Sequence, residues 1–345
     1  MRIKSVTISG LRSFGPNPVT LELGPRTVLI GPHGSGKSTV LMALEMLHAM
    51  ANGRSHEMPC LYDEPWQELP DIAVSAVLEG DTIERSSQVD ILIARDKGGL
   101  IGYSIQSLKI TQSFGANPQP HERARAFEFH GRSFWQVKEQ INEVRQEFDA
   151  LQAIHKYTNV GQTYFAAAVL GGGEFLTSQI AHEFKAMYGD FRGFERVNTL
   201  AQVPTVGIRE NSGRLVLAKY LSSGMRTYLG LLAFLMSAGR HDRKGILVLE
   251  EPDAGLHPDM MHHLAGIIKR ASEHCQILMT TNSPDMVSEF SETPEDVVVV
   301  ERPFDFTELK RVEKAPLEDW LKTFGLGHAR TNRATTGAGA AGCGG

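Results

Sequence analysis

Residues 31–39 read Gly-Pro-His-Gly-Ser-Gly-Lys-Ser-Thr, and this segment constrains the fold more than any other part of the sequence. Spaced glycines followed by Lys-Ser are typical of a loop that binds phosphate through its backbone N–H groups. The apolar residues 28–30 predict a short buried strand before the loop, and residues 40–51, rich in Leu, Met and Ala, predict a helix after it. Because strand, loop and helix are the context that the pattern requires, we expect a nucleoside triphosphate as the ligand.

Each residue type in the loop has a physical role. Glycine tolerates positive φ, so Gly31, Gly34 and Gly36 let the chain curl until successive N–H groups face phosphate oxygens. Lys37 is expected to reach the β and γ phosphates, and the hydroxyl of Ser38 to ligate Mg²⁺. The remaining nucleotide-binding residues of the loop are predicted to be His33, Ser35 and Thr39. The alternative is a chance match in a glycine-rich chain.

Composition sets the outer limits. The chain has 345 residues, 41% of them hydrophobic, which is enough for a sizeable core and up to about two domains. A net charge of -5 gives no global attraction to nucleic acid, so nucleic-acid binding would need a local basic patch. The densest basic segment, 240–244, is equally well explained as a solvated turn.

Cysteine usage and hydropathy bear on the compartment. The three cysteines, at 60, 275 and 343, form neither a metal-ligand spacing nor a disulfide framework. The first residues lack an apolar signal region, and no apolar stretch approaches the length of a membrane span. We therefore expect a cytoplasmic protein without a membrane partner.

A second motif follows a run of four apolar residues, 246–249, that predicts a buried parallel strand. The strand ends in Glu250 and Glu251, and parallel strands deliver such residues to the sheet edge where the phosphate loop also lies. Glu250 is predicted to hold the Mg²⁺ shell, in place of the more usual Asp, and Glu251 to orient or deprotonate the attacking water. The alternative is a strand that ends in two solvated acids.

The rest of the chain alternates between strand-rich and helix-rich blocks. Residues 3–9 and 19–23 predict an antiparallel hairpin, and 71–110 an antiparallel β layer. Apolar residues at threes and fours predict an amphipathic helix over 133–157, within a helical lobe at 120–215 that Gly171-Gly172-Gly173 interrupts. The fold class expected is α/β, a mixed β-sheet with an antiparallel β layer and a helical lobe. Residues 328–345 are expected to form a flexible tail.

A third motif, 221–226, reads Leu-Ser-Ser-Gly-Met-Arg and predicts a helix that the serines cap. In the order phosphate loop, Leu-Ser-Ser-Gly, strand ending Glu-Glu-Pro, the chain resembles the ATPase heads of the ABC superfamily. The opening Ile8-Ser9-Gly10-Leu11-Arg12-Ser13-Phe14 is similar to the start of RecF, SMC and OLD heads, and residues 250–258 are similar to the OLD-like branch. The resemblance implies one ABC-type P-loop head over residues 1–327, with 71–110 and 120–215 inserted between the phosphate loop and the Leu-Ser-Ser-Gly motif.

The resemblance also implies a composite site. Such heads dimerise head to tail, so the phosphate loop of one copy would face Ser222, Ser223 and Gly224 of the other across ATP and Mg²⁺. His257 would lie in the loop that couples the two sites, although a structural histidine beside a turn-forming proline is an equal reading. The glutamine that such heads place in the Q-loop stays open among Gln67, Gln88 and Gln162.

Two departures from the family qualify the expected chemistry. Asn282 stands where the family usually carries a histidine that senses the γ-phosphate, and an amide cannot carry a proton as imidazole does. Hydrolysis of ATP to ADP and phosphate, with Glu251, Asn282 and His257 as the catalytic residues, is therefore expected to be slow or differently gated. The segment after Asn282 is also too short for the nuclease domain of OLD proteins, so we expect no DNA cleavage.

By family analogy, the function expected is an ATP-driven switch, a homodimer or higher oligomer, that controls a separate effector in bacterial anti-phage defence. One alternative is a DNA-repair head of RecF or SMC type that clamps duplex DNA. Another is an ATP-gated scaffold that hydrolyses poorly, which Asn282 suggests, and a membrane-transporter subunit is the most distant.

Overall fold

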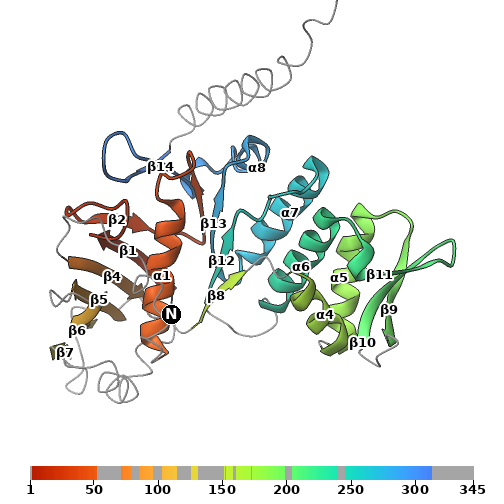
Figure 1. Cartoon of the computed structure of the whole chain (residues 1–345), viewed down its shortest axis with the longest axis horizontal. Helices are drawn as coiled ribbons and strands as arrows, with labels where there is room; N and C mark the ends of the chain where they lie inside the picture. Colours follow the sequence, from red (N-terminus) through yellow and green to blue (C-terminus); the bar gives the residue numbers. More distant parts are fainter. Residues whose placement is uncertain are drawn as a thin grey trace, which may run out of the picture.

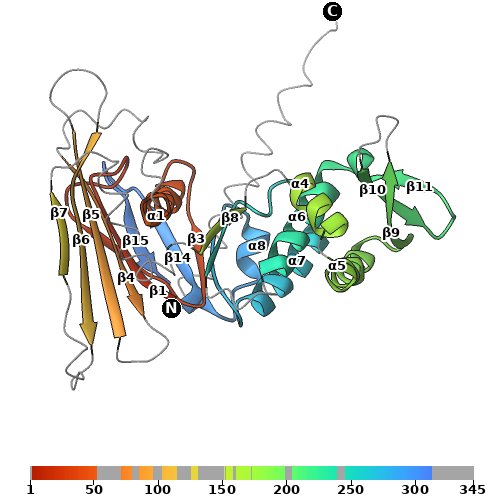
Figure 2. The same ribbon diagram turned by 90° about the horizontal axis from the view of Figure 1, so that it is seen from below.

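The computed structural model describes residues 2–52, 71–79, 85–95, 103–114, 126–130, 151, 153–157, 161–171, 173–198, 204–238 and 245–312. Within these residues the strands form an antiparallel sheet, a mixed sheet and a small three-stranded sheet (Figure 1). Figure 2 shows the antiparallel sheet at one end of an elongated molecule, the mixed sheet and its helices in the middle, and the small sheet at the other end.

The antiparallel sheet has the strand order β2-β1-β4-β5-β6-β7. Its strands are β1 (Arg2–Ser9), β2 (Val19–Glu22), β4 (Asp71–Glu79), β5 (Arg85–Arg95), β6 (Tyr103–Phe114) and β7 (Ala126–His130). β1 pairs with β2 on one side and β4 on the other, so Ile8 lies opposite both Val19 and Val74. Ile3, Val6 and Ile8 are buried on one face. The predicted hairpin of residues 3–9 and 19–23 is confirmed.

The mixed sheet has the order β15-β14-β3-β13-β12-β8. Its strands are β3 (Arg26–Ile30), β8 (Ile154–Tyr157), β12 (Ile246–Glu250), β13 (Gln276–Thr281), β14 (Val297–Glu301) and β15 (Glu308–Arg311), and β15 alone among these pairs antiparallel. The buried parallel strand predicted at 246–249 is confirmed. Because β3, β12 and β13 are parallel, the residues that follow them meet at one edge of the sheet.

Two cores cover the two faces of this sheet. Helix α1 (Lys37–Ala51) lies between the mixed and the antiparallel sheets (Figure 1), and Leu29 and Val248 pack into the core around it. Neighbouring strand residues, such as Val28 and Leu249, point to the opposite face and pack against helices. This alternation explains why the parallel strands are apolar throughout.

The helices on that opposite face are α4 (Gly161–Gly171), α5 (Gly173–Met187), α6 (Ser223–Ala238), α7 (Pro258–Ala271) and α8 (Pro284–Ser288). α6 is central, with Tyr228, Leu231 and Leu232 fully buried. α4 and α5 are separate helices on either side of residue 172, as the glycine triplet predicts. Beyond them lies the small sheet of β9 (Phe191–Asn198), β10 (Pro204–Glu210) and β11 (Leu215–Leu217), and the short helix η4 (Ala218–Tyr220) leads from it to α6.

The amphipathic helix predicted over 133–157 is wrong at its C-terminal end. Residues 154–157 form the edge strand β8, in which Ile154 pairs with Ile246 and Tyr157 with Leu249. Of these four side chains, only Ile154 and Tyr157 are buried. Pairing with β12 therefore decides for a strand here, although the spacing of apolar residues is compatible with a helix. Residues 131–150 and the tail 328–345 lie outside the described residues, and the division of the chain into domains stays a prediction.

A polar cluster joins three of the helices. The hydroxyl of Tyr228 on α6 hydrogen-bonds Nδ1 of His263 on α7, and Nε2 of His263 lies 3.0 Å from Oε2 of Glu183 on α5. Nη2 of Arg270 donates to the other oxygen of Glu183 at 2.7 Å. Burial raises the pKa of Tyr228, and burial lowers the pKa of His263 from its ordinary value of 6.5 despite the nearby Glu183. The cluster therefore favours a neutral imidazole in the folded chain.

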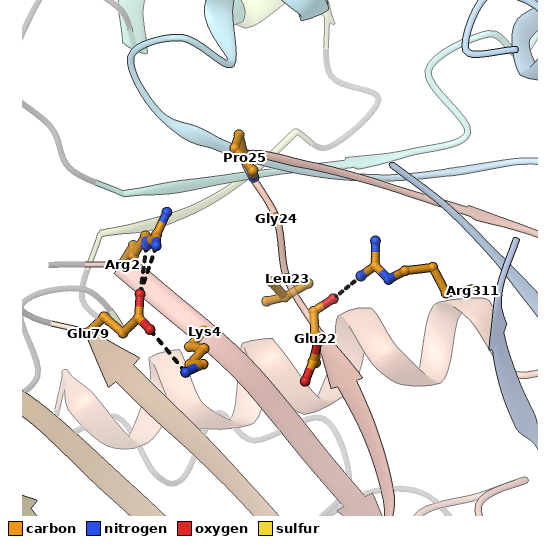
Figure 3. Close-up of a pocket in the computed structure, with 8 residues that line it drawn as sticks. All are labelled: Arg2, Lys4, Glu22, Leu23, Gly24, Pro25, Glu79 and Arg311. Carbon is orange, nitrogen blue, oxygen red and sulfur yellow. Dashed lines mark hydrogen bonds and ion pairs between the residues drawn. The ribbon is translucent and has the colours of Figure 1, made fainter. Parts of the chain in front are cut away.

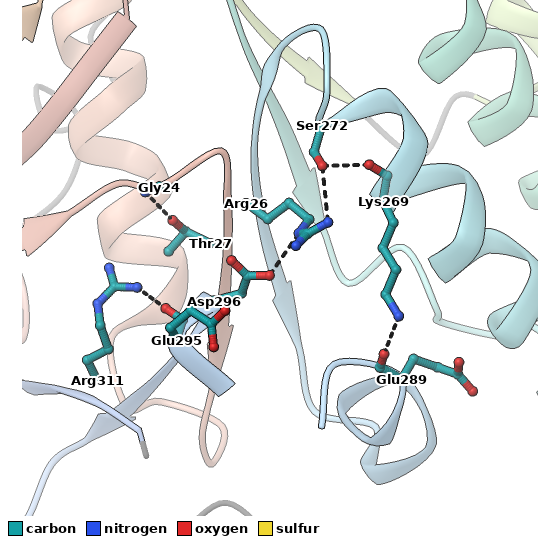
Figure 4. Close-up of polar contacts among 9 residues, drawn as sticks. All are labelled: Gly24, Arg26, Thr27, Lys269, Ser272, Glu289, Glu295, Asp296 and Arg311. Atoms are coloured by element: carbon teal, nitrogen blue, oxygen red, sulfur yellow. Dashed lines mark hydrogen bonds and ion pairs between the residues drawn. The ribbon is translucent and has the colours of Figure 1, made fainter. Parts of the chain in front are cut away.

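A second polar network stabilises the edge of the mixed sheet remote from the phosphate loop (Figure 4). Arg26, the first residue of β3, donates from Nε to Asp296 at 2.8 Å, and its Nη1 lies 3.5 Å from Oγ of Ser272. Lys269 donates to the backbone carbonyl of Glu289 at 2.6 Å. These contacts fix β3, α7 and α8 relative to one another, and Arg26 begins the strand that leads into the phosphate loop.

Candidate phosphate-binding and catalytic site

The loop between β3 and α1 has the backbone that the sequence predicts. Gly31, Gly34 and Gly36 have φ of 145°, 77° and 113°. A Cβ on Gly31 would overlap the carbonyl oxygen of Val300, and a Cβ on Gly36 would overlap Oγ1 of Thr307. Glycine is therefore required at these two positions both for the backbone angle and for the approach of β14 and the residues after it.

Lys37, the first residue of α1, lies inside the loop. Its side chain is buried, and Nζ donates to the carbonyl oxygens of Gly31 at 2.7 Å and Pro32 at 2.9 Å. Burial lowers the pKa of Lys37, and the negative charge of Glu251 opposes this effect. The ammonium group has three donors. The lysine is thus held inside the loop, near the carboxylate of Glu251, with one donor beyond those two bonds.

Thr307 anchors the loop from the segment that follows β14. Its Oγ1 lies 2.8 Å from the carbonyl oxygen of Ser35 and 2.8 Å from Oγ of Ser13, and its N–H donates to the carbonyl of Ser13. Since the Ser35 carbonyl only accepts, the hydroxyl proton of Thr307 goes there and Ser13 donates to Thr307. Ser35, Ser13 and Thr307 are all buried. Three segments far apart in the sequence therefore meet behind the phosphate loop.

Glu250 ends β12 at the same sheet edge and Glu251 follows it, and Glu250 hydrogen-bonds Ser38 of α1. Its Oε2 lies 3.0 Å from Nζ of Lys156 on β8, and Lys156 also pairs with Glu45 of α1 at 2.5 Å. Burial raises the pKa of Glu250, but hydrogen bonds from Ser38 and Lys156 outweigh it and leave the pKa below its ordinary value. The carboxylate is thus charged near neutral pH, and it contacts the hydroxyl predicted to bind Mg²⁺.

Glu251 is held at both ends. Its backbone has φ of 43°, which is uncommon for a residue other than glycine, and its N–H donates to the carbonyl oxygen and Oγ1 of Thr280, both at 3.1 Å. Its Oε1 accepts a hydrogen bond from Nδ2 of Asn282 at 2.7 Å. The same Nδ2 lies 3.3 Å from Nδ1 of His33 in the phosphate loop. The structure therefore brings Glu251, Asn282 and His33 into one cluster.

A pocket of about 380 Å³ lies at the phosphate loop. It is lined by Arg12, Ser13, His33, Gly34, Gly36, Lys37, Ser38, Thr39, Glu251 and Arg302. Lys156, Thr307 and Arg302 were not predicted from the sequence as site residues, and Arg12 was noted only for the family resemblance. No local pattern marks Lys156 or Thr307, because each reaches the site through pairing of distant strands.

The Leu-Ser-Ser-Gly motif lies apart from this pocket. Oγ of Ser222 accepts a hydrogen bond from the N–H of Met225 at 3.3 Å, so the predicted helix cap is confirmed. Ser222 and Ser223 are exposed, and a Cβ on Gly224 would lie 2.7 Å from the carbonyl oxygen of Gly255, which holds the motif against the loop after β12. None of the three residues lines the pocket described for the phosphate loop. Within one chain, the Leu-Ser-Ser-Gly motif therefore does not contribute to the pocket at the phosphate loop.

His257 caps a helix. Its Nδ1 accepts a hydrogen bond from the N–H of Asp259 at 3.3 Å at the start of α7, and its side chain is 69% exposed. His257 therefore has the structural role that the sequence allowed, as a helix cap. Its role in coupling two sites stays a prediction. Among the candidate Q-loop glutamines, Gln88 donates to Asp90 on β5 at 2.8 Å, away from the pocket, while Gln67 lies outside the described residues.

A second pocket, of about 340 Å³, lies where β1, β2 and β4 approach the start of β3 (Figure 3). Glu79 pairs with Arg2 at 2.8 Å and Lys4 at 3.2 Å, and the hydrogen bond from Arg2 holds the pKa of Glu79 below its ordinary value. Arg311 donates to the backbone carbonyl of Glu22 at 2.5 Å. The cations here already have protein partners, so we assign this pocket no ligand.

Metal-ligating side chains, cysteines and apolar helices in the described residues indicate no further site. Among the described residues, no group of three or more His, Cys, Asp and Glu side chains has a metal-binding arrangement. Cys275 is a free thiol whose pKa burial raises to about 11. No helix in the described ranges is long and apolar enough to cross a membrane. The basic segment 240–244, Cys60 and Cys343 lie outside the described residues.

The mixed sheet, the phosphate loop and the paired acids at one sheet edge are the arrangement typical of P-loop nucleotide-binding domains. Residues 120–288 match the model of a family described as an AAA domain, putative AbiEii toxin, Type IV TA system. The matched range contains the Leu-Ser-Ser-Gly motif, the paired glutamates and Asn282. No curated protein sequence matches the chain.

Solved structures agree on the fold. The SMC head domain from Thermotoga maritima aligns with a TM-score of 0.54 and 16% identity, covering 91% of this chain and 100% of that one. An SMC head bound to the C-winged helix domain of ScpA aligns with a TM-score of 0.60 and 13% identity, covering 92% and 99%. The SMC head from Pyrococcus furiosus bound to the C-terminal domain of ScpA gives 0.56 and 10%, covering 93% and 99%. The chain thus has the fold of SMC heads, which confirms the predicted resemblance and fold class.

Proposed function

We propose that this chain is an ATP-binding and ATP-hydrolysing switch. The observation that carries the proposal is the convergence of Lys37, Ser38 and Glu251 around a pocket of about 380 Å³. Glu250 lies beside this pocket, where it hydrogen-bonds Ser38. The pocket offers a backbone cradle and a buried ammonium group for phosphates, and a carboxylate held in place for a water molecule. The AAA-type family match supports ATP as the nucleotide.

The residues present fit a magnesium ion. Ser38 and the charged Glu250 hydrogen-bond one another next to the loop, and Mg²⁺ is commonly bound by one or two protein oxygens together with substrate phosphates. Mg²⁺ would neutralise negative charge on the β and γ phosphates. Lys156 keeps Glu250 ionised, so this carboxylate is ready to bind a cation at neutral pH.

In the proposed reaction, water attacks the γ-phosphorus in line, the bond from phosphorus to the β–γ bridging oxygen breaks, and ADP and phosphate form. Glu251 orients the water and accepts its proton. Asn282 fixes the carboxylate through its N–H at 2.7 Å, and Lys37 stabilises negative charge on the phosphates. Asn282 itself cannot shuttle a proton, which supports slow turnover.

The switch is proposed to act through head-to-tail dimerisation. Ser222 and Ser223 are exposed at the start of α6 and do not line the pocket of their own chain. A γ-phosphate would give them charge-assisted hydrogen bonds across two copies that ADP cannot give, so ATP favours the dimer and hydrolysis releases it. His257 is proposed to lie in the loop that couples the two sites.

The test compares MgATP turnover of the wild type with that of Glu251→Gln, with Lys37→Ala as the control for nucleotide binding. We expect wild-type turnover well above that of Glu251→Gln, and loss of ATP binding in Lys37→Ala alone. Equal and negligible rates in the wild type and Glu251→Gln would remove the ATPase proposal and favour the ATP-gated scaffold.

Dimerisation is tested by sizing Glu251→Gln with ATP and with ADP. We expect a dimer with ATP only, and its loss in a Ser222→Arg variant that still binds ATP. Ser178→Arg, on the exposed face of α5, is the matched control and should not change the ATP-dependent dimer. A monomer in both nucleotide states would refute the dimer switch.

The biological role proposed is control of a separate effector in bacterial anti-phage defence. The family description, which names a putative toxin of a toxin–antitoxin system, supports this context. Purification together with the product of the neighbouring gene, followed by sizing with ATP and with ADP, tests it. A neighbouring product that never co-purifies in either state would count against an effector encoded there.

A DNA clamp is the second candidate, because the chain shares the fold of SMC heads. It predicts salt-dependent binding to plain duplex DNA in the presence of ATP. Absence of such binding with and without ATP would leave the effector switch as the better proposal.

A further inference from the structure

One amide nitrogen links the phosphate loop to the catalytic carboxylate. Nδ2 of Asn282 lies 2.7 Å from Oε1 of Glu251 and 3.3 Å from Nδ1 of His33. Glu251 and Asn282 follow the neighbouring strands β12 and β13, whereas His33 belongs to the loop after β3. A residue of the phosphate loop therefore contacts the group that holds Glu251.

Hydrogen-bond chemistry fixes the direction of these contacts. An ionised carboxylate only accepts, so the amide must turn its NH₂ group toward Glu251, and the reverse orientation would place two oxygens against each other. The second N–H of the amide is then available to His33, whose Nδ1 must accept it. The ring proton of His33 consequently lies on Nε2. Oδ1 of Asn282 is buried and has no partner among the described residues, so the two N–H groups alone orient the amide.

The orientation of the Asn282 amide matters because it helps to hold Glu251 in an uncommon conformation. The backbone of Glu251 has φ of 43°, and such a conformation persists for a residue other than glycine only where the surroundings fix it. Thr280 fixes the backbone N–H, and Asn282 fixes the carboxylate. Without His33, the amide of Asn282 keeps its bond to Glu251 but loses the second contact that sets its rotation.

We propose that His33 is a positioning residue for ATP hydrolysis, which acts by accepting the second N–H of Asn282 and so holding Glu251 on the attacking water. This inference rests on the proposed ATPase function. It assigns to a side chain of the phosphate loop a role in the hydrolytic step in addition to the phosphate binding that the loop backbone provides.

The test is a double-mutant cycle on MgATP turnover with His33→Ala, Asn282→Ala and the double variant. Loss of one positioned hydrogen bond predicts a kcat lowered about fivefold to tenfold in His33→Ala, with KM changed less than about twofold. Because both residues act through one contact, the double variant should be no slower than Asn282→Ala by more than about twofold. His262→Ala, at an exposed histidine of α7 that pairs with Glu289, is the matched control and should match the wild type.

An exchange of the two residues separates positioning from mere packing. His33→Asn leaves two amides and Asn282→His leaves two imidazoles, whereas the double exchange restores one of each. We expect the double exchange to turn over at least about threefold faster than either single variant. A thermal melt of each variant identifies any that fails to fold. Nitrogen NMR of labelled histidine gives a readout independent of turnover, since Nδ1 of His33 should change its chemical shift in Asn282→Ala.

The outcomes distinguish the two proposals. Wild-type turnover no higher than that of Glu251→Gln overturns the ATPase proposal, and this inference with it. Suppose instead that the wild type hydrolyses ATP, that the effects of His33→Ala and Asn282→Ala multiply in the double variant, and that the double exchange is no faster than the single variants. This result overturns the positioning role of His33 but leaves the ATPase proposal standing. An unchanged His33 signal in Asn282→Ala would also overturn this role, because the contact would then be absent in solution.

Discussion

Replacing Thr307 by valine should loosen the phosphate loop while leaving the shape of the core intact. Thr307 is 1% exposed, and its hydroxyl lies 2.8 Å from both the Ser35 carbonyl and the Ser13 hydroxyl. Valine keeps nearly the same volume but removes both hydrogen bonds and leaves the buried Ser35 carbonyl without this partner. With about 1 kcal/mol for each bond and a further penalty for the unsatisfied acceptor, the free energy of unfolding should fall by about 2 to 3 kcal/mol.

The assay is urea unfolding of the wild type and Thr307→Val, followed by calorimetric titration with MgATP. We expect a lower midpoint with an unchanged m-value, because the surface exposed on unfolding is the same. We also expect weaker MgATP binding, since the nucleotide must now order a loop that Thr307 ordered in the wild type.

The chain supplies a matched control in Thr293. Its Oγ1 is also buried, but it has no hydrogen-bond partner among the described residues. Thr293→Val therefore removes a hydroxyl that is already unsatisfied, and stability should stay the same or rise by up to about 1 kcal/mol. If Thr293→Val destabilises as much as Thr307→Val, or if Thr307→Val matches the wild type, the assignment of Thr307 as the anchor of the loop is refuted.

Other predictions use the same structure. Because burial lowers the pKa of His263, the unfolded chain binds more protons below about pH 6.5, so stability should fall on acidification; His263→Gln should flatten this slope in urea midpoints measured between about pH 7 and pH 5. Lys156→Met removes a cation that helps to hold the pKa of Glu250 low, so the acidic limb of the pH–rate profile should move to higher pH, and an unmoved limb would contradict this role. Gly36→Ala, at φ of 113° with Thr307 in the way, should weaken MgATP binding by more than about tenfold, whereas Gly34→Ala, with open space around its Cβ position, should show a smaller loss from backbone strain alone.

Local patterns in the sequence were sufficient for the elements that carry the motifs. The glycine spacing of 31–36 predicts the loop because the positive φ of Gly31, Gly34 and Gly36 is a local backbone requirement. The four consecutive apolar residues before Glu250 predict a strand that is buried on both faces. A serine before an apolar helical run predicts the cap at Ser222. In each case the physical cause lies within a few residues of the signal.

Distant pairings could not be predicted in this way. β8 carries an apolar period compatible with a helix, and only its pairing with β12 brings Lys156 to Glu250. Thr307 and Ser35 are 272 positions apart, and Asn282 and His33 are 249 apart. No single-sequence pattern links such residues. The position of Glu250, Glu251 and Asn282 near the phosphate loop was therefore predictable, but the residues that hydrogen-bond them were not.

These partners restrain Glu250, which stands where the family usually has an aspartate. Glu250 has an extra methylene, which would leave its carboxylate freer to rotate, but Lys156 and Ser38 hold it from two sides. Lys156 in turn bonds Glu45 of α1, the helix that begins with Lys37. The carboxylate predicted to hold Mg²⁺, on β12, is thus linked through Lys156 to α1, the helix that carries the lysine predicted to hold the phosphates. A longer acid is tolerated because α1 and β8 together remove the freedom that its length adds.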